Sequence, residues 1–173
     1  MSEFSASYHI KTSDQQKVID LIRASNNKGY VFPESNGWVT FLIQGPAFGI
    51  RKSIVSLNPG LLVHYSYMED HGWELIIFEK DEIVSTYKCD WTDDLIIEKD
   101  EFDLFLLREL IIQQGNTAED IEDIEEIFDL VRFTGEEPPA YLIAKKLGLR
   151  YFEWLSSDNI GDGEHYENIV FVD

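Results

Sequence analysis

The side chains best suited to chemistry lie close together near the middle of the chain. His64 and His71 flank Glu69 and Asp70, and imidazole and carboxylate groups are common ligands of zinc and other divalent ions. The spacing fits such a site poorly, because six residues separate the two histidines and this interval crosses the expected end of a strand and a turn. We therefore predict no metal and no other cofactor, and keep these four residues only as the candidates for a metal-dependent hydrolase.

Other signatures of catalysis are missing from the sequence. It contains no Gly-x-Ser-x-Gly elbow, no Walker-type phosphate loop and no Gly-x-Gly-x-x-Gly motif. The single cysteine, Cys89, falls on the apolar side of an alternating strand, a position typical of a buried thiol rather than a nucleophile. We therefore expect a protein that is not an enzyme.

Negative charge is the main compositional feature of the chain. The 173 residues include 33 acidic and 14 basic ones, for a net charge of −19. Such a surface repels the phosphates of nucleic acids and anionic membranes, and it attracts basic proteins. Between Asp90 and Pro139 there are seventeen acidic residues and three basic ones, so that −14 of the −19 lies in one stretch. The simpler interpretation, that the charge only maintains solubility, stays open.

The acidic stretch has the periodicity of helices. Isoleucines recur at helical spacing from Ile121 onward, and acidic residues fill the rest of that surface. We predict that this surface binds a basic protein, as an inhibitor or immunity-type protein masks a basic bacterial effector such as a nuclease. The candidate partner-binding residues are Glu122, Asp123, Glu125, Glu126 and Asp129.

Aromatic residues concentrate on the predicted strands and support a different function. A concave sheet face lined by rings would bind a small molecule or a lipid, and core packing is the competing interpretation. The ligand-pocket candidates are Trp38, Tyr65, Tyr67, Trp73 and Trp91.

Strands and turns dominate the first ninety residues. The alternation in 83–91 and the nearly apolar run 74–78 predict a hairpin, and Asn36-Gly37 predicts another between 30–35 and 38–43. Residues 50–57 and 61–68 are expected to be further strands. A helix is expected from Ser13, which with Gln16 has the spacing of a capping box.

The second half of the chain is expected to be mainly helical. Residues 100–114 carry apolar side chains widely around the circumference, which predicts a well-buried helix, and Pro138-Pro139 opens another that ends near Gly148. The predicted fold is therefore α+β, with an antiparallel sheet of about five to seven strands, an N-terminal helix and a C-terminal acidic helical block.

We expect one domain, residues 1–173. Residues 1–92 would form mainly the sheet with one helix, residues 93–160 the helical block, and residues 165–173 a last strand that returns to the sheet. No basic N-terminal segment is followed by an apolar run, and no apolar stretch is long enough to span a bilayer, so a cytoplasmic location is expected.

Overall fold

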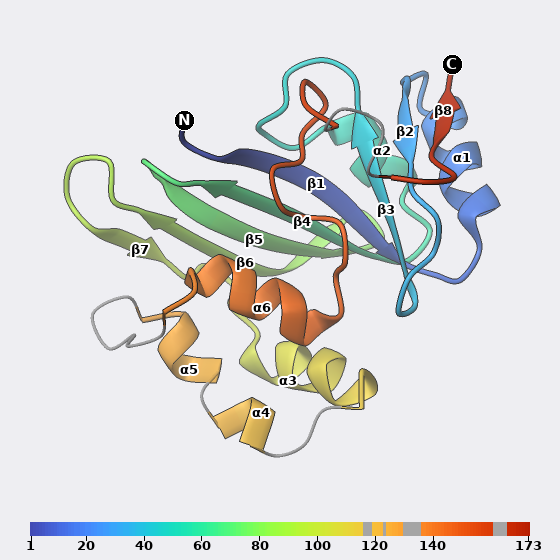
Figure 1. The fold of residues 1–173 in the computed structure, drawn as a ribbon. Helices are drawn as coiled ribbons and strands as arrows, with labels where there is room; N and C mark the ends of the chain where they lie inside the picture. Colours follow the sequence, from blue (N-terminus) through green and yellow to red (C-terminus); the bar gives the residue numbers. More distant parts are fainter. Residues whose placement is uncertain (116–118, 123, 130–135, 161–165) are drawn as a thin grey trace.

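A computed structural model describes residues 1–115, 119–122, 124–129, 136–160 and 166–173. Its centre is an antiparallel sheet of eight strands in the order β7-β6-β5-β4-β1-β3-β2-β8, with helices on both faces (Figure 1). The α+β class with an antiparallel sheet is confirmed, and the sheet exceeds the five to seven strands expected from the sequence. The strands are β1 (Phe4–Lys11), β2 (Gly29–Val31), β3 (Trp38–Ile43), β4 (Leu61–Met68), β5 (Gly72–Glu79), β6 (Glu82–Asp90), β7 (Ile96–Glu98) and β8 (Val170–Val172).

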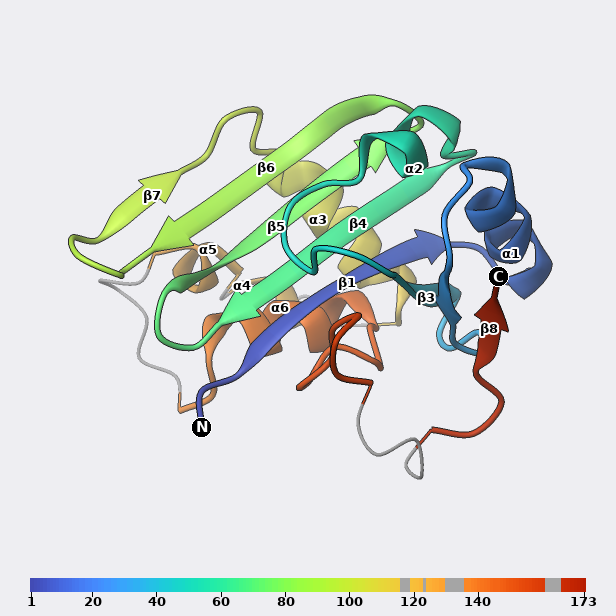
Figure 2. The same ribbon diagram turned by 90° about the horizontal axis from the view of Figure 1, so that it is seen from above.

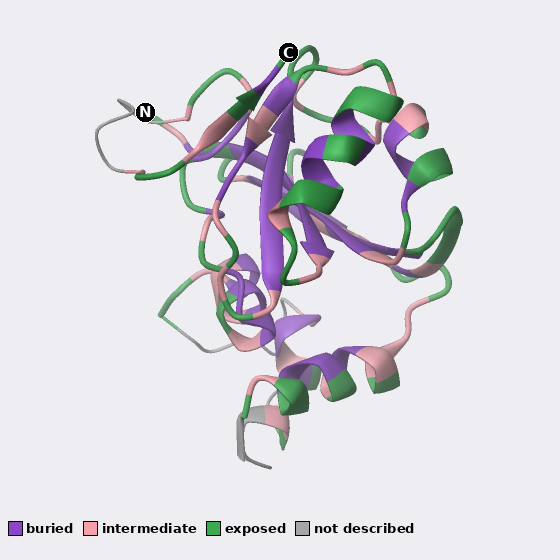
Figure 3. Ribbon diagram, turned by 90° about the vertical axis from the view of Figure 1, so that its right-hand side faces the viewer, coloured by how far each residue is buried: buried purple, intermediate pink, exposed green. Residues whose placement is uncertain are grey.

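The helices divide between the two faces of the sheet. Viewed from above, α2 lies in front of the sheet and α1 beside β8, whereas α3 and α6 lie behind it (Figure 2). Figure 3 shows the exposed side of α1 turned away from the sheet and its buried side turned towards it. The helices are α1 (Gln15–Ala24), α2 (Lys52–Leu57), α3 (Leu104–Gln113), α4 (Glu119–Glu122), α5 (Ile124–Ile127) and α6 (Pro139–Leu147).

Two large apolar clusters fill the spaces between the sheet and its helices. On one side, Val18 and Ile22 of α1 and Ile54 of α2 pack with strand residues such as Phe41 and Ile76. On the other side, the buried rings and aliphatic chains of β3 to β6 pack against α3, α5 and α6. In β4 and β5, alternate residues contribute to opposite clusters, because successive side chains of a strand point to opposite faces.

The segment 50–57 differs from the expected strand, because residues 52–57 form helix α2. Its apolar positions Ile50, Ile54 and Val55 fit a helical face, while the alternate positions of a strand would mix Ile50 with Lys52 and Ser56. Both Ile54 and Val55 are buried against the sheet. The β-branched residues of this segment favour a strand, but packing against the sheet selects the helix.

Two local features also differ from expectation. The N-cap of α1 is Asp14 rather than Ser13, and its side chain accepts a hydrogen bond from the backbone N–H of Gln16 at 3.0 Å. In β6, a register shift opposite Ile77 and Phe78 turns Ile83 out to solvent, so the alternation of buried residues begins at Ser85.

Candidate functional site

The acidic surface of the helical block contains the predicted partner-binding residues on α4, on α5 and just beyond it. Glu122 and Glu125 are exposed, whereas Glu126 and Asp129 are half-buried. Asp123 lies outside the described residues. Glu125 forms an ion pair with Arg108 of α3, with 3.3 Å between Arg108 Nη2 and Glu125 Oε1. This pair joins α3 and α5 at the surface.

Apolar contacts underneath fix the direction in which these acids point. Ile124, Ile127 and Phe128 are buried, and the ring of Phe128 stacks on Trp73 of β5 with 5.7 Å between ring centroids. Since the apolar side of α5 faces the sheet, the carboxylates between these residues face solvent. Further exposed acids of the block include Glu101 and Glu109 of the α3 region.

Helix α3 of the same helical block exposes two large apolar side chains. Phe105 is 68% exposed and Ile112 is 53% exposed, although the sequence predicts a well-buried helix. The face at positions 107, 110 and 111 is buried, and the opposite face at 105, 108, 109 and 112 is turned outward. In the sequence, the charged residues Arg108 and Glu109 indicate that this second face is exposed to solvent.

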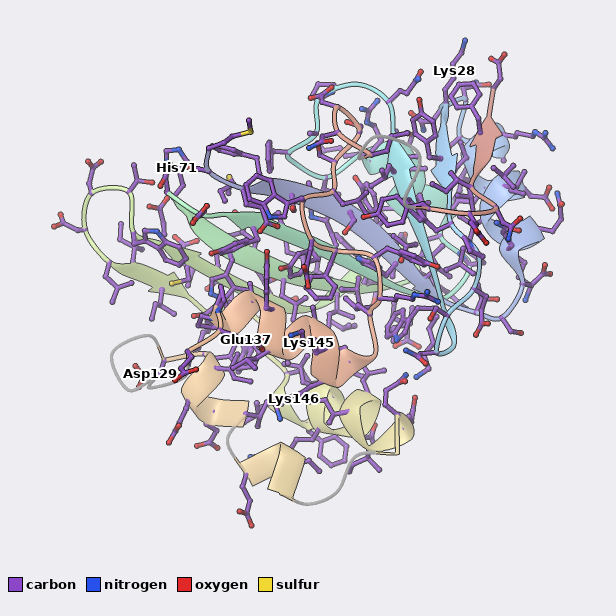
Figure 4. The ribbon with its side chains drawn as sticks, viewed as in Figure 1. Lys28, His71, Asp129, Glu137, Lys145 and Lys146 are labelled. Atoms are coloured by element: carbon purple, nitrogen blue, oxygen red, sulfur yellow. The ribbon has the colours of Figure 1, made fainter. Side chains whose placement is uncertain are left out.

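A second ion pair ties α6 to the segment that precedes it. Lys145 and Glu137 lie next to one another in Figure 4, and Nζ is 2.6 Å from Oε1. Both side chains are about half exposed, so the pair contributes at most about 1 kcal/mol to stability. Most of the described acidic side chains of the block are exposed to solvent, where they can attract an approaching positive charge.

The four candidate metal ligands do not converge. His64 is buried on the α1 side of the sheet against the ring of Tyr8, at 4.7 Å between centroids. His71 is half-buried in the turn between β4 and β5, where its Nδ1 lies 3.0 Å from Thr92 Oγ1 (Figure 4). Glu69 and Asp70 are exposed in the same turn. Within the described ranges, no group of three or more His, Cys, Asp or Glu side chains is placed to hold a metal ion.

Two histidines are buried completely and remain neutral. His9 is bracketed by Ser7 Oγ at 2.8 Å and Thr40 Oγ1 at 2.7 Å. Burial lowers the pKa of His9 to about 3, helped by the nearby charge that His64 would carry. Burial alone lowers the pKa of His64 to about 4, and neither of its ring nitrogens has a hydrogen-bond partner among the described residues. Groups this inaccessible cannot exchange protons with a substrate.

The ligand-pocket candidates are mostly core residues. Trp38, Tyr65, Tyr67 and Trp73 are buried beneath the helices of the second face, and the indole N–H of Trp38 donates to the carbonyl of Leu147 at 2.8 Å. Trp91 is half-buried at the margin of that cluster. The helices α3 to α6 occupy the space in which a ligand would have to lie.

A buried carboxylate that the sequence does not reveal joins the two ends of the chain. Glu3 accepts hydrogen bonds from Ser5 Oγ at 2.6 Å, from the Tyr141 hydroxyl, and from the backbone N–H of Trp154 at 2.9 Å. Burial and the bond to Glu3 raise the pKa of the Tyr141 hydroxyl. Tyr141 and Trp154 are separated from Glu3 by more than a hundred residues of sequence, so no local pattern identifies these contacts.

The single cysteine lies in the core. Cys89 is buried and its burial raises the pKa of the thiol, which keeps it protonated and unreactive. In the part of the chain that the structure describes, every helix is too short or too polar to cross a bilayer.

No protein-family model matches the chain, and no curated protein or solved structure is significantly similar to it.

Proposed function

We propose that this chain is a non-enzymatic interaction module whose acidic surface, over α3 to α5, docks on a basic protein and masks it, as an inhibitor or immunity-type protein would. The observation that carries the proposal is that Phe105 and Ile112 lie exposed on the face of α3 that also carries Glu109, in a helical block whose other exposed acids include Glu122 and Glu125. Charge would bring the partner in, and the two apolar side chains would supply contact area once the interface is dry.

Long-range attraction is supported by the whole charge distribution. The chain carries −19, and Glu101, Glu109, Glu122 and Glu125 lie exposed on the same helical block. A field of this kind raises the association rates of basic partners by about ten-fold to a thousand-fold, and salt weakens it. A partner that meets this surface through lysines and arginines would therefore bind faster at low ionic strength.

The chemistry of the described residues also favours binding over catalysis. His9 and His64 are closed to solvent and neutral near pH 7, and the thiol of Cys89 is buried. Tyr141 and Tyr87 have their pKa values raised by burial, so their hydroxyls stay protonated. These groups are thus placed for packing and hydrogen bonding rather than for proton transfer.

Reversing the charge of Glu122 and Glu125 to lysine tests the acidic surface. We expect the double variant to lose a basic protein that the wild type captures from native lysate at low salt, and we expect association with that purified protein to slow by about ten-fold or more. Surface-plasmon kinetics at several salt concentrations measure the rate and its salt dependence.

The matched control reverses Asp20 on α1 and Asp81 at the turn between β5 and β6. Both are exposed, and they carry the same total charge change away from the helical block. This control should keep the captured protein and most of the association rate. If the two double variants lose binding equally, only net charge matters and the acidic surface is not the docking site. If neither loses it, the proposal is wrong.

A further inference from the structure

A cleft of about 400 Å³ opens at the start of β1, away from the acidic surface. Four separate parts of the chain line it: the N-terminal segment with Met1, Ser2 and Phe4, the loop at 47–48, Asp70, and the segment with Trp154, Ser156, Asp158 and Asn159. The side chains of His71 and Phe4 meet beside it, with 5.9 Å between ring centroids. No spacing in the sequence links these parts, and only the folded sheet brings them together.

Three aromatic rings line this cleft and remain in contact with water. Phe4 is 43% exposed, Phe48 is 39% exposed and Trp154 is 42% exposed. Phe4 and Phe48 meet edge to face, with 6.1 Å between their centroids. Exposed rings that gather in one hollow, while most other aromatic side chains of the chain are buried, are typical of a binding site.

Trp154 is held in a backbone conformation that a tryptophan rarely adopts. Its φ angle is +50°, in the left-handed region, which costs about 1 kcal/mol or more for a bulky residue. The conformation is fixed by the hydrogen bond from its N–H to Glu3 and by the next residue, because Leu155 donates to Ser5 Oγ at 3.1 Å and accepts from Ala6 N–H at 2.8 Å. Glycine or asparagine would meet this geometry with less strain. A strained residue with an exposed ring indicates that the ring serves a contact outside the chain.

The charged side chains of the cleft are both negative, and the α-amino group of Met1 is a single positive group beside them. Asp70 and Asp158 line it and both are exposed, and no lysine or arginine is among the lining residues that the structure describes. Asp70 accepts a hydrogen bond from Ser2 Oγ. Among the described residues neither carboxylate is paired with a cation. Ring faces and carboxylates together attract one class of ligand group, an organic cation.

We propose that this cleft binds the guanidinium group of an arginine side chain presented by a protein partner. A guanidinium is planar, so it stacks on a ring while its N–H groups donate to a carboxylate, whereas an ammonium group cannot do both as well. The charge of −19 favours a basic chain as the source. The inference rests on the proposed function in one respect, that the partner is basic, but it concerns a different surface.

The test is a titration of ¹⁵N-labelled protein with the peptide acetyl-Gly-Arg-Gly-amide, followed through the indole N–H resonances. The chain has four tryptophans, and the spectrum of Trp154→Asn identifies the signal of Trp154 by its absence. We expect this signal to shift and saturate with the arginine peptide. The matched peptide with citrulline has nearly the same shape without the charge, and it should bind at least ten-fold more weakly. The lysine peptide should also bind more weakly than the arginine peptide.

Two further measurements separate a binding role from a structural one. Trp154→Asn removes the ring but tolerates a positive φ, so its melting temperature should equal or exceed that of the wild type, while its binding of the arginine peptide, measured by calorimetry, should be at least ten-fold weaker. Phe48→Ser provides a second variant, and Asp70→Asn with Asp158→Asn should weaken the peptide at least five-fold. Glu122→Lys with Glu125→Lys should leave peptide binding unchanged, which keeps this test independent of the acidic surface.

Several outcomes would overturn the assignment. One is an indole spectrum that the arginine peptide does not change. Another is equal binding of the citrulline or lysine peptide, which would remove the requirement for a guanidinium. A third is unchanged peptide binding in Phe48→Ser and in the double asparagine variant, which would place the peptide elsewhere.

Discussion

Lowering the pH from 7 to 5 is expected to reduce the free energy of unfolding by about 3 to 4 kcal/mol, because His9 and His64 stay neutral in the folded protein. In the unfolded chain both take up a proton below about pH 6.5, while in the folded chain they do so only near pH 3 and pH 4. The unfolded state therefore binds more protons as the pH falls through this window. Each histidine contributes a slope of up to about 1.4 kcal/mol per pH unit. Urea unfolding at pH 7, 6 and 5, at constant ionic strength, measures the effect.

The variant His64→Leu assigns half of this effect to one residue. Leucine has a similar volume and no polar atoms, and the ring it replaces has two buried nitrogens that find no hydrogen-bond partner in the described part of the chain. We expect equal or greater stability at pH 7 and a loss of stability towards pH 5 that is smaller by about 2 kcal/mol than in the wild type. A pH dependence that is flat in the wild type, or that His64→Leu leaves unchanged, would show that the buried histidines do not control it.

Replacing Glu3 with alanine is expected to destabilise the protein by about 2 to 4 kcal/mol. The change leaves three buried or half-buried donors without their acceptor: Ser5 Oγ, the Tyr141 hydroxyl and the N–H of Trp154. Hydrogen bonds to a charged acceptor are stronger than neutral ones, and buried donors without partners are costly. The midpoint of urea unfolding at pH 7 gives the change, provided that the slope of the transition stays constant.

The control for this change is Glu153→Ala, which removes a carboxylate from an exposed position next to Trp154. It should alter stability by less than about 0.5 kcal/mol. A double-mutant cycle with Tyr141→Phe then isolates the contact between Glu3 and Tyr141, for which we expect a coupling of about 1 kcal/mol or more. Equal effects of Glu3→Ala and Glu153→Ala would mean that the buried network contributes nothing beyond charge.

The sequence predicts the strands better than the helices of this fold, for physical reasons. Strand β6 alternates strictly from Ser85 to Cys89, and β3 follows an Asn-Gly turn, so both have strong local signals. The three residues of β7, Ile96–Glu98, are too few to show an alternation. Helix α2 has β-branched residues that favour a strand, and only its docking against the sheet selects the helix.

The candidate sites depend on contacts between distant residues, which explains what the sequence could not reveal. The acids of α4 and α5 were visible as a charged stretch, and their positions are described for Glu122, Glu125, Glu126 and Asp129. The exposed rings of Phe4, Phe48 and Trp154 come from three unrelated segments, and the positive φ of Trp154 has no counterpart in local sequence. Sites assembled in this way require the fold before they can be found.

The contact between Ser5 and Leu155 has a consequence for biosynthesis. These residues lie 150 positions apart, and the backbone of the first strand is completed by Leu155 through the N–H of Ala6. A growing polypeptide that emerges from the ribosome must carry this first segment without that contact until Leu155 has been translated. We therefore expect nascent chains stalled before residue 150 to remain sensitive to protease and to depend on chaperones, whereas chains in which Leu155 has left the ribosome become resistant.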